Sequence, residues 1–102
     1  MDILNITFNV EKNVLPTWKK FMGQVFIPYA NVQERFAGHN LFQVMVEDDT
    51  AVTYSYQLIA ENEAIIASFK EEIFPALIRE MNQVFGQKVL YFDTLLKEVN
   101  MS

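Results

Sequence analysis

The order of the hydrophobic patterns along this chain is the strongest constraint on its folding. Apolar and polar side chains alternate in four segments, as they do in strands that bury one face. Two other segments repeat apolar side chains at helical spacing, three and four residues apart. The alternating segments are residues 2–11, 41–47, 51–60 and 88–99, and the helical segments are residues 13–37 and 62–85. The order is therefore strand, helix, strand, strand, helix, strand.

This order is that of two strand-helix-strand units joined by a hairpin. It predicts an α+β, ferredoxin-like βαββαβ fold, in which a four-stranded antiparallel sheet carries two helices on one face. The chain has 102 residues, of which 51% are hydrophobic, and this is enough for one core. No linker, repeat array or biased tract interrupts it. We therefore expect a single domain over residues 1–102.

Both helical segments contain a proline beyond their opening turn, Pro28 and Pro75. A proline inside a helix removes a backbone donor and clashes with the preceding turn, so we expect each helix to kink or restart there. Asn13 and Asn62 can cap the two helix N-termini, and Gly86 can close the second helix. The expected buried stripes are Trp18, Phe21, Met22, Val25, Tyr29, Val32 and Phe36 in the first helix, and Ile65, Phe69, Ile73, Leu77 and Met81 in the second.

Alternation also predicts which side of the sheet the helices cover. We expect this side to carry Leu4, Phe8, Val44, Tyr54 and Leu90. The opposite side then exposes more apolar surface than a small soluble monomer usually does. A second copy of the chain is the simplest partner for that side, and the alternative is a monomer with scattered exposed apolar residues. The predicted homodimer interface consists of Ile3, Met45, Ile59, Tyr91 and Leu95.

Asp93 is expected on the same uncovered side, midway along the last strand. A carboxylate there would lose its hydration if two facing sheets enclosed a cavity, so it would need a partner or a ligand. Asn5, Gln57 and Tyr91 are the polar groups that we expect around such a small-molecule ligand. Two functions remain open: a homodimeric structural or interaction module, and a small-molecule-binding protein or cofactor-free enzyme with Asp93 as its base.

Other chemistries are disfavoured. The net charge of −5 and the expected core position of the aromatic residues argue against nucleic-acid binding. No apolar run is long enough for a membrane span and no signal-peptide pattern is present, so we expect a cytoplasmic protein. The acidic turn 47–49 lacks the glycine of a calcium loop. His39 has no neighbouring ligand and is expected in a loop, so we expect neither a metal nor a cofactor.

Several short motifs also resemble a known family. These motifs are Asn5-Ile6-Thr7-Phe8-Asn9-Val10, Trp18, Ile27-Pro28, Thr53-Tyr54-Ser55-Tyr56-Gln57, Phe85-Gly86 and Phe92-Asp93-Thr94-Leu95-Leu96. They are similar to the short bacterial proteins grouped as domain of unknown function 4286, over nearly the whole chain. The resemblance implies a ferredoxin-like fold similar to the dimeric α/β barrels, and no established activity. Relatives often have His in place of Phe26 and near Met81, and Arg in place of Asp93, so the resemblance implies no shared proton carrier at these positions.

Overall fold

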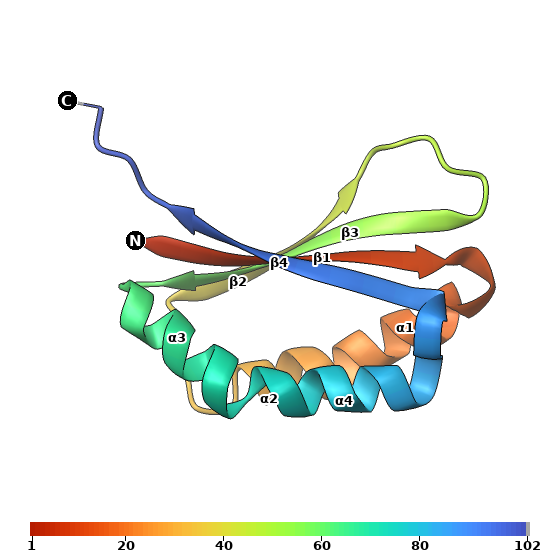
Figure 1. Cartoon of the computed structure of the whole chain (residues 1–102), viewed down its shortest axis with the longest axis horizontal. Helices are drawn as coiled ribbons and strands as arrows, with labels where there is room; N and C mark the ends of the chain where they lie inside the picture. Colours follow the sequence, from red (N-terminus) through yellow and green to blue (C-terminus); the bar gives the residue numbers. More distant parts are fainter. Residues whose placement is uncertain (102) are drawn as a thin grey trace.

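The computed structural model describes residues 1–101; Ser102, the last residue of the predicted domain, lies outside them. Four strands form one antiparallel sheet (Figure 1). Their order across the sheet is β2-β3-β1-β4. Their bounds are Asp2–Glu11 (β1), Gly38–Val44 (β2), Ala51–Ala60 (β3) and Val89–Lys97 (β4). The helices form a second layer on one side of this sheet (Figure 1). The predicted ferredoxin-like α+β fold is confirmed.

The helical layer consists of two runs of short helices. The first run contains η1 (Lys12–Val14), α1 (Leu15–Phe21), η2 (Met22–Phe26) and α2 (Ile27–Ala30). The second run contains α3 (Glu63–Glu72), α4 (Phe74–Phe85) and η3 (Gly86–Lys88). Each run connects two strands, because the first leads from β1 to β2 and the second from β3 to β4.

Pro28 accounts for the interruption of the first run. It has no amide hydrogen, so it cannot donate to the carbonyl four residues back. The residues before it form a wide π-turn, in which the Ile27 amide donates to the Met22 carbonyl five residues earlier. This turn moves the buried stripe by one residue, to Phe26 and Ala30. The predicted interruption is confirmed, and the predicted burial of Val25, Tyr29 and Val32 is wrong, because all three are exposed.

The second run begins and ends as predicted. Asn62 caps α3, since its Oδ1 accepts a hydrogen bond from the Ile65 amide at 3.2 Å. Pro75 lies in the first turn of α4 and separates α3 from α4. Gly86 closes α4 with a φ of 56°, a conformation that favours glycine. The predicted cap at Asn13 is wrong, because this residue lies inside η1 and not at a helix N-terminus.

The core lies between the sheet and the helical layer. Trp18 of α1 is fully buried, and its ring centroid lies 5.4 Å from that of Phe8 and 4.8 Å from that of Tyr54. Such aromatic pairs add to the free energy that burial alone supplies. The buried strand residues belong mainly to the central pair, namely Leu4, Ile6, Phe8 and Val10 of β1 and Tyr54, Tyr56, Leu58 and Ala60 of β3.

The predicted faces are correct for β1 and β3 and wrong for β4. Residues that pair across an antiparallel sheet point to the same side. Asp93 pairs with Ile6, whose buried side chain faces the helices, so Tyr91 and Leu95 lie on the helix side as well. Leu90, which was expected under the helices, points to the opposite side. Both sets of alternate residues in this strand are largely apolar, so hydrophobicity alone does not orient it.

The face predicted for β2 is also wrong. This strand runs from Gly38 to Val44, and therefore starts and ends three residues before the predicted strand. Val44 pairs with Thr53 and lies on the side that the helices leave uncovered. Met45 follows the end of β2, so it is not part of the sheet. Its side chain is 84% exposed. His39 lies within β2 and not in a loop.

Candidate functional site

We call the side of the sheet without helices the open face (Figure 1). The strand register places its residues in four rows that cross the sheet from β2 through β3 and β1 to β4. We name each row after its β2 residue. The Val44 row continues with Thr53, Asn9 and Leu90; the Phe42 row with Ser55, Thr7 and Phe92; the Asn40 row with Gln57, Asn5 and Thr94; and the Gly38 row with Ile59, Ile3 and Leu96.

The middle of the open face is polar, and its side chains bond to one another. The Ser55 hydroxyl donates to Asn5 Oδ1, and Asn5 Nδ2 donates to Thr7 Oγ1 at 3.1 Å. Asn9 Nδ2 donates to Thr53 Oγ1 at 3.4 Å. All five side chains are half-buried, so their amide and hydroxyl groups are held in place at the surface. Groups of this kind suit the recognition of uncharged polar molecules.

Both edges of the open face carry large apolar side chains. Phe42, which is 51% exposed, and Val44 occupy the β2 edge. Phe92, which is 61% exposed, and Leu90 occupy the β4 edge. Aromatic rings exposed to this degree on one face are typical of interaction surfaces. A hollow of about 280 Å³ lies beside the β4 edge and is lined by Thr7, Asn9, Thr53, Leu90, Tyr91 and Phe92.

The four rows carry no charge. None of their residues is Asp, Glu, His, Lys, Arg or Tyr. No side chain within the rows therefore titrates near neutral pH. The open face can donate and accept hydrogen bonds and can bury apolar groups, but acid or base catalysis there would need a group from outside the rows.

Two of the predicted ligand-binding residues meet on this face. Asn5 and Gln57 are paired neighbours in the Asn40 row. Asp93 does not join them, because it lies on the helix side, where its carboxylate forms an ion pair with Lys70 Nζ of α3 at 2.7 Å. The predicted arrangement of Asn5 and Gln57 around an Asp93 base is therefore wrong.

Tyr91 is also on the helix side. Its ring packs edge-on against Phe74 of α4, with centroids 5.9 Å apart and an interplanar angle of 84°. Leu95 shares this side, since it pairs with the buried Leu4. Of the predicted interface residues, Ile3 and Ile59 do lie together on the open face, in the Gly38 row. The open-face apolar residues that sequence reasoning did not place there are Phe42, Val44, Leu90, Phe92 and Leu96.

A separate polar network lies on the helix side near β2. Asn31 Nδ2 donates to the Ile27 carbonyl at 2.9 Å and to the Tyr56 hydroxyl oxygen at 3.1 Å. The Tyr56 hydroxyl also forms a hydrogen bond with His39 Nδ1, 3.2 Å away. Burial raises the pKa of the Tyr56 phenol above its usual value, and the bond from Asn31 opposes this only in part. The network links the end of α2 to the sheet.

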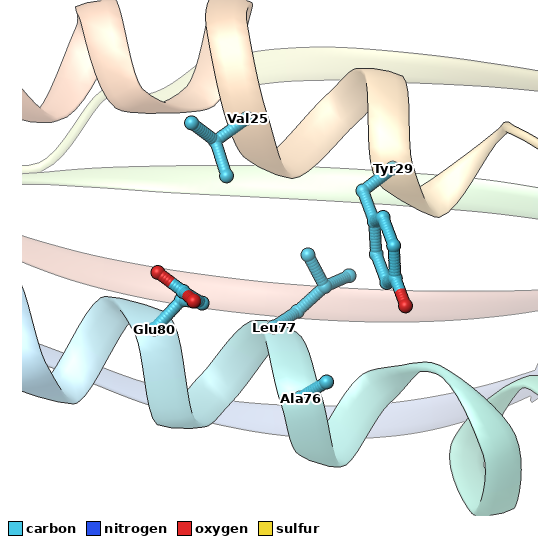
Figure 2. A pocket seen from close by; sticks show the side chains of 5 residues that line it. All are labelled: Val25, Tyr29, Ala76, Leu77 and Glu80. Atoms are coloured by element: carbon cyan, nitrogen blue, oxygen red, sulfur yellow. The ribbon is translucent and has the colours of Figure 1, made fainter.

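The helical layer has a hollow of its own on its outer side, of about 290 Å³. Figure 2 shows Val25 and Tyr29 on the first helical run facing Ala76, Leu77 and Glu80 on α4. Its lining has one carboxylate, on Glu80, and no cationic side chain. A lone carboxylate beside apolar groups does not provide a paired acid and base. The open face combines two exposed aromatic rings with a group of hydrogen-bonded polar side chains, and we regard it as the better candidate site on that ground.

The acidic turn between β2 and β3 has a structural explanation. Asp48 Oδ1 accepts hydrogen bonds from the Thr50 amide at 2.8 Å, the Thr50 hydroxyl at 2.9 Å and the Ala51 amide at 3.2 Å. These bonds hold the pKa of the Asp48 carboxyl below its usual value, the Thr50 amide being the largest cause. Within residues 1–101, no group of three or more His, Cys, Asp or Glu side chains is arranged to hold a metal ion. No helix in that range has the length and hydrophobicity needed to cross a membrane.

Comparison with known families identifies the chain. A family model described as "Domain of unknown function (DUF4286)" matches residues 1–99. The chain belongs to this family. The resemblance found in its short motifs is thus confirmed. No curated protein matches the chain in sequence.

Solved structures with the same fold include natural and designed proteins. An ethyl tert-butyl ether D (EthD) family protein from Bacillus halodurans C-125 has a TM-score of 0.65 and 9% identity, over 97% of this chain and 100% of that one. A putative antibiotic biosynthesis monooxygenase from Bacillus cereus has a TM-score of 0.55 and 14% identity, over 99% and 97%. The de novo designed ferredoxin-fold protein LFR1 1 has a TM-score of 0.53 and 15% identity, over 100% and 90%. At these identities the likeness extends to the fold alone.

Proposed function

We propose that this chain is a homodimeric interaction module whose two subunits meet through their open faces. The exposed aromatic and aliphatic side chains at both edges of that face carry the proposal. Phe42 and Phe92 lie in the same row, at opposite edges of the sheet, and each leaves about half or more of its surface in water. Burying such rings against a second sheet would remove this apolar surface from water, at about 25 cal/mol per Å².

The size of the open face fits this role. The four strands have 10, 7, 10 and 9 residues, and at about 3.3 Å per residue and about 4.8 Å between strands they span a projected area of roughly 570 Å². Side chains protrude from the sheet, so the accessible surface of the open face is larger than its projected area. It approaches the ~800 Å² per partner that a stable complex buries. The absence of charge in the four rows helps as well, because no charged side chain of these rows would lose its hydration in the contact.

The test is the solution mass of three proteins. The wild type is expected to be a dimer, and Phe92→Glu is expected to be a monomer, because a carboxylate at the centre of the β4 edge would lose its hydration on dimerisation. Val84→Glu is the matched control: Val84 is 55% exposed on α4, away from the open face, and its variant should remain a dimer. A monomeric wild type, or a dimeric Phe92→Glu, would contradict the proposal.

A second candidate function is the binding of a small, uncharged polar molecule between the two sheets. The hydrogen-bonded group of Asn5, Thr7 and Ser55 favours it, because these side chains would face the partner sheet in the middle of the contact. A purely apolar contact would have no need of them. Because the rows hold no titratable group and Asp93 is paired with Lys70 on the other side, binding is better supported than catalysis.

Ligand binding can be tested by thermal shift with a panel of neutral sugars, polyols and amides. A ligand that binds the native state raises the melting temperature by mass action. Gln57→Ala should lower the affinity for any such compound about tenfold, because one hydrogen bond to the ligand is lost. Gln43→Ala is the matched control, since Gln43 lies on the helix side of β2. If no compound stabilises the wild type, or if both variants lose binding equally, the second candidate fails.

A further inference from the structure

We infer that the two subunits are related by a two-fold axis that runs along the strands, between β1 and β3, so that β2 of each subunit lies over β4 of the other. This inference rests on the proposed homodimer and specifies which residues meet. It follows from the distribution of residues within the rows of the open face.

The two rows nearest the β2–β3 hairpin read almost the same from either edge. The Phe42 row has an aromatic ring at each end, with Ser55 and Thr7 between them. The Val44 row likewise has aliphatic ends and a polar middle. A two-fold axis along the strands exchanges the two edges of the sheet while it keeps each row in place. In each of these rows, an end residue therefore lies over a residue of the same kind from the partner subunit. An isologous interface requires such self-complementarity.

This arrangement pairs like with like. Phe42 lies over Phe92 of the partner subunit, and Thr7 lies over Ser55 of the partner subunit. The rings gain contact with rings, and hydroxyls face hydroxyls with which they can form hydrogen bonds. In the Gly38 row, Ile59 lies over Ile3 of the partner subunit in the same way.

The shape of the surface at Gly38 also supports the axis along the strands. It lies at the end of its row opposite Leu96, which is 41% exposed. The glycine has no side chain, and a Cβ built there would make only an ordinary contact with Ile59 Cδ1, at 3.8 Å. The space above Gly38 can therefore receive Leu96 of the partner subunit, so that a large side chain meets a small one.

The other face-to-face arrangement matches poorly. A two-fold axis across the strands would keep each strand over its own copy and exchange the ends of the sheet. Phe42 would then lie over Asn40 of the partner subunit, and Phe92 over Thr94 of the partner subunit. Both aromatic rings would cover polar groups that had lost water without gaining a hydrogen bond, which is unfavourable. The axis along the strands avoids this cost.

Single cysteines can distinguish the two axes, because the sequence has no native cysteine. Asn40→Cys and Thr94→Cys remove no apolar contact, and they lie at opposite edges of the same row. With the axis along the strands, residue 40 faces residue 94 of the other subunit, and copies of residue 40 lie far apart. Two variants that carry different tags are coexpressed and treated with a short bismaleimide, whose reach suits sheets about 10 Å apart.

The expected result is a cross-linked heterodimer of the two variants, with no cross-link in either variant alone. Cross-linking of Asn40→Cys to itself would instead indicate the axis across the strands and overturn the inference. A preparation that is dimeric by mass but gives no mixed cross-link would overturn it as well. A monomeric mass for the wild type and for both variants is a different outcome, which would contradict the proposed homodimer itself.

Discussion

The carboxylate of Asp93 on β4 meets the ammonium group of Lys70 on α3 at 2.7 Å, on the helix side of the sheet. The two side chains remain 25% and 46% exposed, respectively, so water screens their attraction. This ion pair joins an edge strand to a helix. The sequence pattern had predicted this carboxylate on the open face, whereas the strand register places it on the helix side.

We expect Asp93→Asn to reduce the free energy of unfolding by about 1 kcal/mol or less, as is typical of exposed ion pairs. Oligomeric mass should not change, because Asp93 does not lie on the open face. Urea denaturation and light scattering of the same sample measure the two quantities. A change of mass would show that this side of β4 takes part in the subunit contact.

Trp18 is the residue whose truncation should destabilise the protein most. It is fully buried between Phe8 and Tyr54, so Trp18→Ala would leave a large cavity and cost about 3–5 kcal/mol. Trp18→Phe should cost less, because the indole Nε1 is buried without a partner within residues 1–101, and its removal relieves that penalty. Chemical denaturation at one protein concentration compares the variants. Tyr29→Ala, at an exposed aromatic residue, is the control and should change stability by about 0.5 kcal/mol or less.

Tyr56 should make the protein sensitive to alkali. Burial raises the pKa of its phenol in the folded state above the usual value of about 10. The unfolded chain therefore loses this proton at a lower pH than the folded protein does. The resulting stabilisation is fully present below pH ~10 and is lost as the pH rises toward the folded-state pKa.

Denaturation midpoints measured from about pH 8 to pH 11 test this prediction. The midpoint of the wild type should fall more steeply above pH ~10 than that of Tyr56→Phe, which cannot ionise. At neutral pH the variant should lose about 1 kcal/mol, because the bonds to Asn31 and His39 are gone. Parallel pH curves for the two proteins would count against a perturbed phenol.

Glu72 should have the opposite pH dependence. The hydrogen bond from Arg35 and its positive charge hold the pKa of the Glu72 carboxyl below its usual value of 4.5. Arg35 also donates to Ser68 Oγ at 2.7 Å, so it joins the segment before β2 to α3. The contribution of this carboxylate is present above pH 4.5 and is lost as the pH falls through the lowered folded-state pKa.

Glu72→Gln removes that contribution and is compared with the wild type by thermal melting between about pH 3 and pH 7. The wild type should be the more stable of the two at neutral pH, and the difference should vanish in acid. Glu71→Gln serves as a matched control, because Glu71 is the adjacent exposed carboxylate. If the melting temperatures of wild type and Glu72→Gln differed by the same amount across this pH range, the charge of Glu72 would not be the cause of the stabilisation.

Local sequence determined the elements and the two central strands. In β1 and β3 one set of alternate residues is apolar and the other is mostly polar, so only one orientation buries the apolar set. The prolines and Gly86 interrupt or end the helices through their own backbone geometry, which needs no distant contact. For this reason the fold class, the helix breaks and the Asn62 cap could all be predicted.

The orientation of the edge strands was decided by the tertiary structure. In β2 and β4 both sets of alternate residues include large apolar side chains, such as Leu41 with Phe42 and Tyr91 with Phe92. Burial then does not distinguish the two orientations, and the choice depends on how each strand pairs with its central neighbour. A shift of one residue in that pairing turns every side chain of the strand over. Asn5, Gln57, Ile3 and Ile59 were therefore placed correctly from the sequence, whereas the faces of Tyr91, Asp93 and Leu95 depended on hydrogen bonds to a strand far away in the chain.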